Sequence, residues 1–118
     1  MESLPLDGDV LILAGGRANV TPDRLVPLVR RAQAALGPRF DDYDRRFECV
    51  HADDARALFL VPRGHWAELG AELEIEAEAA DALRRAHEQQ LLRVGSNRGR
   101  REEFETAMEI REVVVVGR

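Results

Sequence analysis

Apolar residues recur at helical spacing along residues 21–36, and clear signals mark both ends of this stretch. At Thr21-Pro22-Asp23 a threonine N-cap, a proline at the first helical position and an early carboxylate all indicate a helix start. Gly37-Pro38 ends the pattern. Pro27 cannot donate a backbone hydrogen bond, so we expect a kink there or a delayed helix start.

A second helical stripe lies in the C-terminal half of the chain. Its members are spaced by three, four, four and three residues and are Ala80, Leu83, His87, Leu91 and Val94. Gly95 follows the stripe and is the expected stop signal. A shorter helix is expected after Gly64, where Trp66, Leu69 and Leu73 are suitably spaced.

Runs of β-prone residues predict a small sheet. Two such runs, 47–51 and 57–61, are separated by turn-forming aspartates and predict a hairpin over residues 46–61. The second run is apolar on both faces, so it suits a central strand and needs a third strand beside it. Val113–Val116 is expected to supply that strand. Apolar residues alternate over 103–111, which predicts a longer strand, but good helix formers there keep a helix as the alternative.

Residues 9–16 have two interpretations. As a strand and glycine turn, Leu13-Ala14-Gly15-Gly16-Arg17 resembles the opening Leu-Ala-Gly-Gly-Arg of sugar-nucleotide and molybdopterin-guanine nucleotidyltransferases, a resemblance that implies nucleotide binding. The later Arg-x-Gly-type signature of that family and a βαβ continuation are missing. As a helix, Val10, Leu13, Ala14 and Ala18 share one face, and a tight turn at 18–20 leads into the next helix, as in a helix-turn-helix.

These elements predict an α+β fold with about four helices and a small, mostly antiparallel sheet. The length of 118 residues and the hydrophobic content of 45% suit a single domain over residues 1–118. No apolar run approaches the roughly 20 residues of a membrane span, and the first residues lack the features of a signal peptide. Cys49 is the only cysteine, so a reducing cytoplasm is the expected compartment.

Acidic residues outnumber basic ones, at 22 against 17, and every basic residue in that count is arginine. A surface rich in carboxylates and free of lysine suits a high-salt cytoplasm, and a GC-rich coding sequence would also favour arginine. The net charge of −5 argues against general affinity for nucleic acids or anionic membranes.

Few residues are candidates for chemistry. Cys49 and His51 alternate on a predicted strand and so share a face, which His65 could approach, but a single thiol without paired ligands predicts no metal site. We predict no catalytic residue and no cofactor. A ligand pocket between the sheet and the helix of His87 is the alternative function, although a buried histidine is more often bonded internally. The residues predicted to line that pocket are Tyr43, His51, Trp66 and His87.

Three short segments of the chain resemble a small uncharacterised protein family of halophilic archaea. They are the helix entry Asn19-Val20-Thr21-Pro22-Asp23, the Phe-x-x-Val of the hairpin and Ala86-His87-x-x-Gln90, within residues 7–95. The resemblance implies no known activity. It agrees with the high-salt environment that the composition suggests.

The expected function is a non-catalytic interaction module that binds a protein partner or a second copy of itself. A winged-helix-like regulator is one form of this prediction, in which Arg24, Arg30 and Arg31 would contact DNA and the hairpin would form the wing. The negative net charge makes DNA the less favoured partner. Val113–Val116 would template strand pairing if left exposed, so we also predict a homodimer through this edge or an adjoining apolar face.

Overall fold

The computed structural model describes residues 4–18 and 20–118, and within them the chain forms six α-helices, one short 3-10 helix and three strands. The elements in chain order are α1 (Gly8–Ala18), α2 (Pro22–Leu36), η1 (Gly37–Arg39), α3 (Phe40–Arg46), β1 (Glu48–Ala52), β2 (Arg56–Pro62), α4 (His65–Glu72), α5 (Ala77–Asn97), α6 (Arg101–Ala107) and β3 (Arg111–Gly117). The predicted α+β class is confirmed, while the expected number of about four helices is too low.

The sheet is antiparallel throughout, with the strand order β1-β2-β3. β2 is therefore the central strand, as its two apolar faces predicted, and β3 pairs with it over its whole length. The hairpin of β1 and β2 contains a bulge between Cys49 and His51, which lie opposite Phe59 and Leu58. Consecutive partners point to opposite faces, so the bulge places Cys49 and His51 on opposite faces of the sheet rather than on one.

Side chains from three helices close the outer edge of β3. Val113, Val115 and Gly117 alternate along this strand, so their backbone groups point away from β2. The Trp66 indole N–H donates to the Val113 carbonyl over 2.8 Å, and His87 Nδ1 accepts the Val115 N–H over 2.8 Å. The Gln33 amide donates to the Val115 carbonyl over 2.6 Å and accepts the Gly117 N–H over 2.9 Å.

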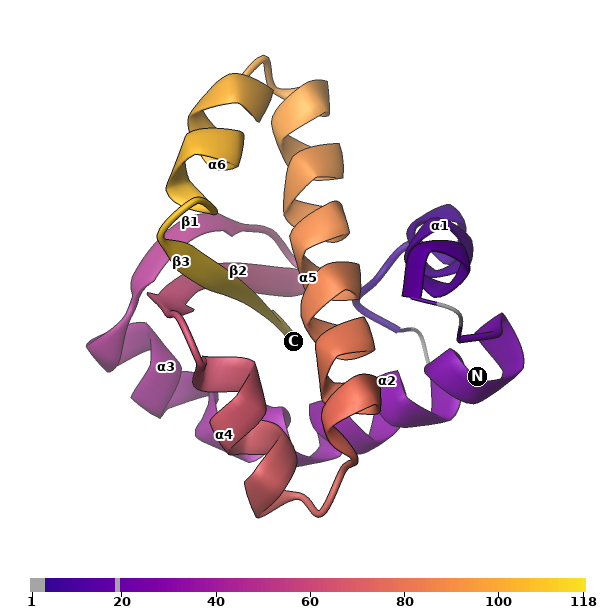
Figure 1. The fold of residues 1–118 in the computed structure, drawn as a ribbon. Helices are drawn as coiled ribbons and strands as arrows, with labels where there is room; N and C mark the ends of the chain where they lie inside the picture. Colours follow the sequence, from indigo (N-terminus) through magenta and orange to yellow (C-terminus); the bar gives the residue numbers. More distant parts are fainter. Residues whose placement is uncertain (1–3, 19) are drawn as a thin grey trace.

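Helix α5 is the longest element and organises the rest of the fold. It runs beside β3, and α1, α4 and α6 pack along it (Figure 1). Its predicted stripe is confirmed, because Ala80, Leu83, His87, Leu91 and Val94 are all buried. The rings of Phe40 and Tyr43 pack against Phe59 of the central strand β2.

Gly95 does not end α5, which continues to Asn97. A Cβ atom at this position would lie 2.7 Å from Phe104 Cδ2 and 3.0 Å from the Arg101 Cα. The absence of a side chain at Gly95 therefore allows α6 to pack closely against α5. Gly95, which we expected to stop the helix, is a packing site instead.

Residues 9–16 are helical, so the helix interpretation is right and the strand with a glycine turn is wrong. The buried face carries Val10, Leu11 and Ala14, whereas Leu13, which we expected on it, is 45% exposed. Of the other expected features, the Ala18 side chain and Asn19 in the turn lie outside the described residues.

Helix α2 begins at the predicted position, with Thr21 as N-cap and Pro22 as the first helical residue. The Thr21 side chain, however, forms no capping hydrogen bond to any described residue. The helix also continues through Pro27 without a delayed start. Four of its residues are fully buried and form its core face: Leu25, Val29, Ala32 and Leu36.

The predicted long C-terminal strand is correct only for its last part. Val113–Val116 lies within β3, as predicted, but residues 101–107 form α6 and only three residues separate this helix from β3. Phe104 is the one fully buried side chain of α6, so the segment buries a helical face rather than alternate residues. High helix propensity therefore outweighed the apparent period of two.

Candidate functional site

His87 lies in the core between α5 and β3. Its side chain is fully buried, and burial lowers its pKa to about 3, so the ring is neutral. Because Nδ1 accepts the Val115 N–H, the ring proton sits on Nε2, for which no partner exists among the described residues. The Trp66 ring packs on the imidazole with 4.5 Å between centroids. His87 thus accepts a hydrogen bond from the edge strand β3, and it lines none of the hollows described below.

Tyr43 lies in a different part of the molecule, on α3. Its hydroxyl is 2.5 Å from His65 Nε2. Burial raises the pKa of Tyr43 to about 12 and lowers the pKa of His65, so both groups are neutral and the hydroxyl donates to the ring nitrogen. The Tyr43 ring also packs on Phe47 and Phe59. This pair joins α3 to the start of α4.

His51 lies at the end of β1 and lines a separate hollow of about 550 Å³ beside the end of α5. Its Nε2 is 3.0 Å from the Asp53 carboxylate, which also accepts the N–H groups of Ala55 and Arg56 in the hairpin turn. The His51 hydrogen bond is the largest of the contacts that lower the pKa of Asp53. Across the described chain, no cluster of three His, Cys, Asp or Glu side chains could hold a metal ion.

The structure therefore brings together only two of the four predicted pocket residues, Trp66 and His87. Tyr43 and His51 belong to separate local networks. Both networks connect neighbouring elements of the fold.

The three arginines of α2 that we proposed for DNA line two hollows. Arg24 and Arg31 line a groove with Asp23, Glu74 and Glu76, and Arg31 donates to the Leu73 carbonyl. Arg30 lines a different hollow, beside Gln33 and Arg118. The hairpin is part of the sheet, with β2 as its central strand.

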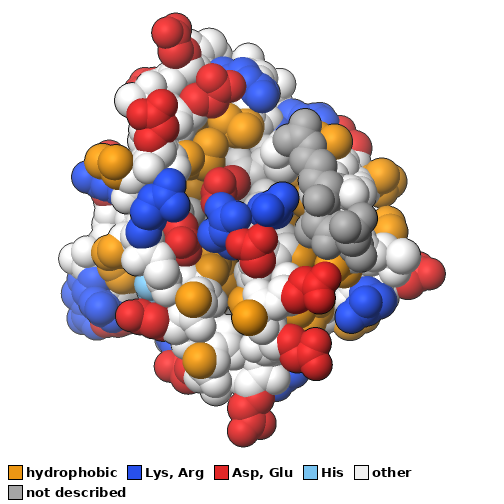
Figure 2. Space-filling model, in the orientation of Figure 1, with side chains coloured by type: hydrophobic (Ala, Val, Ile, Leu, Met, Phe, Trp, Pro, Cys, Tyr) orange, Lys and Arg blue, Asp and Glu red, His pale blue; other side chains and the backbone are white. Residues whose placement is uncertain are grey.

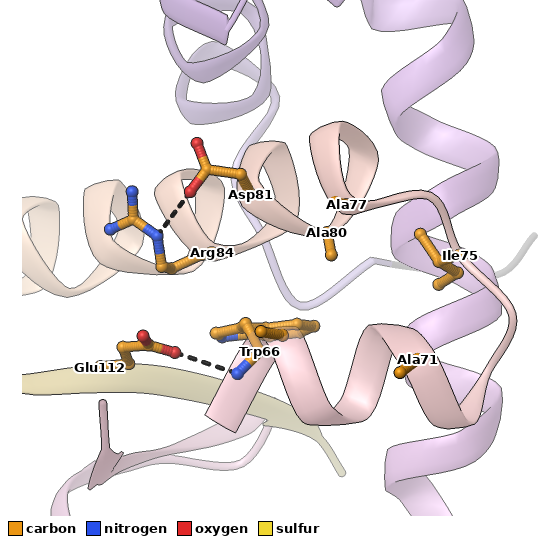
Figure 3. Close-up of a pocket in the computed structure, with 9 residues that line it drawn as sticks. Trp66, Ala71, Ile75, Ala77, Ala80, Asp81, Arg84 and Glu112 are labelled. Atoms are coloured by element: carbon orange, nitrogen blue, oxygen red, sulfur yellow. Dashed lines mark hydrogen bonds and ion pairs between the residues drawn. The ribbon is translucent and has the colours of Figure 1, made fainter. Parts of the chain in front are cut away.

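A pocket of about 350 Å³ lies between α4 and α5 (Figure 3). The two helices touch at Gly70, where a Cβ atom would lie 2.7 Å from the Ala80 Cβ. The pocket is mainly apolar, and its charged lining residues are Asp81, Arg84 and Glu112. Its other lining residues are Trp66, Ala67, Ala71, Ile75, Ala77 and Ala80.

Glu112 closes one end of this pocket, and Ile75 lies at the other end (Figure 3). The Glu112 carboxylate accepts the backbone N–H groups of Gly64 and Trp66, over 2.9 Å and 3.0 Å, at the start of α4. The sequence suggested no role for Glu112 or for Gln33, because their partners lie 46 to 84 residues away. In the sequence, Glu112 stands out only as a polar residue at the edge of the apolar run 113–116.

Helix α1 presents apolar side chains to solvent. Ile12 is 64% exposed and Leu13 is 45% exposed, and they are adjacent in α1. Orange side chains reach the surface on the side of the molecule where α1 lies (Figure 2). Asp9, the one acidic residue of α1, pairs with Arg93 of α5. This face is therefore apolar and without an unpaired acid.

The fold and these sites define a small α+β domain in which helical side chains close the edge of a three-stranded sheet. The chain belongs to a family described as a domain of unknown function (DUF8048), whose profile matches residues 4–118. No curated protein and no solved structure matches the chain. Among the described residues, no helix is both long enough and apolar enough to cross a membrane.

Proposed function

We propose that this domain is a non-catalytic interaction module that binds a second copy of itself through the outer face of α1. The exposure of Ile12 and Leu13 carries the proposal. Val10, Leu11 and Ala14 already fill the inner face, so α1 is apolar on both sides. Large apolar side chains that stay exposed on a helix whose other face is already buried mark an interaction surface.

A second copy suits this face because its centre, Ile12 and Leu13, is apolar. The whole chain carries a net charge of −5, so most of its surface repels another copy. On α1 the single acid, Asp9, is neutralised by Arg93. Two such faces can meet around a two-fold axis with their apolar side chains in contact, and two-fold dimers are the commonest soluble oligomers.

The three histidines form hydrogen bonds within the fold, and this supports a role without catalysis. His87 bonds the backbone of β3, His65 bonds Tyr43 and His51 bonds Asp53. Each histidine thus has a structural partner. The same observations favour self-association over the alternative of a pocket at His87, and the net charge of −5 favours it over a DNA-binding face.

The setting proposed for this module is a cytoplasm rich in salt. The support is compositional: 22 acidic residues, 17 arginines and no lysine. At high ionic strength the repulsion between acidic copies is screened, which leaves the apolar contact of α1 to dominate.

Sedimentation velocity over a concentration range of about 5 to 500 µM tests the proposal. The apparent mass should rise from 13.2 kDa towards twice that value, and the double variant Ile12→Glu/Leu13→Glu should stay at 13.2 kDa. Ile110→Glu is the matched control, because Ile110 is 70% exposed but lies between α6 and β3. A wild-type chain that keeps the monomer mass throughout, or a dimer that only Ile110→Glu disrupts, contradicts the proposal.

A further inference from the structure

The pocket between α4 and α5 ends at a carboxylate that has no cationic partner. The exposed fraction of Glu112 is 7%, and no arginine or histidine within the described chain forms an ion pair with it. Its two hydrogen bonds come from neutral backbone N–H groups at the start of α4. A nearly buried charge is normally paired, because its desolvation is costly.

Arg84, the basic residue of the pocket lining, is engaged elsewhere. Its guanidinium donates to Asp81 over 2.9 Å and to Glu88 over 2.5 Å, and Figure 3 shows the side chain turned towards Asp81 and away from Trp66. The pKa of Glu88 is raised mainly by burial, and the nearby Glu112 carboxylate adds to the rise. Arg84 opposes this rise, so its charge serves Asp81 and Glu88 and leaves Glu112 without a direct ion pair.

The remaining wall suits a compact apolar body. Alanine side chains from both helices, Ile75 and the Trp66 ring line the space between Glu112 and the far end (Figure 3). A volume of about 350 Å³ lies at the small end of the range for ligand pockets. The occupant that fits is a small molecule with one charged end.

We propose that this pocket binds a small organic ammonium ion, with its cationic group against Glu112 and its apolar body between Trp66 and the alanines of α4 and α5. Each Glu112 oxygen keeps a lone pair beyond its backbone hydrogen bond and can accept an N–H of the ammonium group. The site is separate from the outer face of α1 and does not depend on self-association.

Titration with benzylammonium, followed by amide NMR shifts of α4 and α5, tests the site. Benzyl alcohol matches its size without the charge, and benzoate carries the opposite charge. Benzylammonium should bind in a saturable manner and at least about tenfold more tightly than either. The proposal is overturned if benzyl alcohol binds equally well or if none of the three binds.

Two pairs of variants locate the binding. Glu112→Gln should weaken benzylammonium binding by about tenfold or more, whereas Glu78→Gln, which changes the net charge equally at an exposed position of α5, should not. Ala71→Leu should fill the pocket and abolish binding, while Ala34→Leu on the exposed side of α2 should not. The alanine pair decides the matter if Glu112→Gln does not fold. Equal effects within the pair that folds overturn the proposal.

Discussion

The Nδ1 atom of His87 accepts a hydrogen bond from the backbone N–H of Val115 over 2.8 Å, between α5 and the outer edge of the sheet. Gln33 and Trp66 occupy neighbouring backbone groups of the same edge. These side chains make the bonds that a fourth strand would otherwise make, and an open edge would template pairing with another chain. The predicted ordering of the valine strand within its own sheet is confirmed. Its edge is largely occupied, so contact between copies is better sought on another surface.

Replacing His87 should destabilise the fold strongly. His87→Ala removes a fully buried ring and leaves the Val115 N–H without its acceptor, so we expect the free energy of unfolding to fall by about 3 kcal/mol. Urea unfolding of the wild-type and variant chains measures the difference. A loss below about 1 kcal/mol would mean that the edge does not need this side chain.

The pH dependence of stability should carry the signature of His87. Its folded pKa of about 3 lies below the ordinary value of 6.5, so between these values the unfolded chain binds a proton that the folded chain does not. The contribution of His87 to the free energy of unfolding is therefore fully present above about pH 6.5. It is lost as the pH falls, by up to about 1.4 kcal/mol per pH unit.

His87→Asn isolates this contribution, because asparagine keeps a short polar group but does not titrate. The free energy of unfolding of the variant should fall less steeply between about pH 6.5 and 4.5. His65 remains in both proteins, and its lowered pKa acts in the same direction in each. Parallel curves for the two proteins would show that His87 does not titrate on unfolding.

Glu74 occupies a backbone conformation that favours glycine, with φ of 58° just after α4. The Ile75 N–H bonds to the Gly70 carbonyl over 2.8 Å, and the Glu74 N–H bonds to the Ala71 carbonyl over 3.2 Å, which is the Schellman pattern of a helix end. Glu74→Gly should therefore raise the free energy of unfolding by about 1 kcal/mol.

The matched control for this substitution is Glu68→Gly, at an exposed position inside α4, which should cost about 1 kcal/mol. Chemical denaturation of both variants provides the comparison. If both glycines destabilise the chain, the left-handed conformation of Glu74 carries no strain.

Added salt should stabilise the protein. The 22 acids outnumber the 17 arginines, so the folded chain repels itself, and screening relieves this repulsion more than it weakens exposed ion pairs. The melting temperature should rise from low salt to about 1 M. A melting temperature that falls over this range would remove the support for a high-salt setting.

Periodic patterns predicted the elements that bury one continuous face. The stripe from Ala80 to Val94 has the spacing of a helix, and it forms the buried side of α5. The run at 57–61 has two apolar faces, and it is the central strand. In both cases the local pattern and the tertiary environment agree, which is why the sequence alone was sufficient.

The errors arose where long-range packing decides the outcome. Residues 103–111 fit both periods, and helix propensity together with the packing of Phe104 beside Gly95 favours the helix in the first part of this segment. The bulge that separates Cys49 from His51 has no strong signal in the sequence. Thr21 marks the helix start correctly, but its side chain makes no capping bond within the described chain, so Thr21→Ala should cost less than the usual 1 kcal/mol or so of such a cap.

The closure of the β3 edge could not be inferred from the sequence. Gln33 lies on α2 and Trp66 on α4, and each meets β3 only after the helices have packed around the sheet. The same holds for the pocket at Glu112, whose walls come from two helices and a strand. Local patterns describe elements, whereas these sites depend on the relative placement of several elements.

A dilution series followed by amide NMR tests most directly whether copies of the chain meet through α1 while the sheet edge stays closed. On dilution from about 1 mM to 10 µM, the amide signals of Ile12, Leu13 and Gly16 should move as the dimer dissociates. The signals of Val113–Val116 should stay in place, because their edge is held by His87, Gln33 and Trp66. Shifts concentrated in β3, or no shift at any position, would contradict this account.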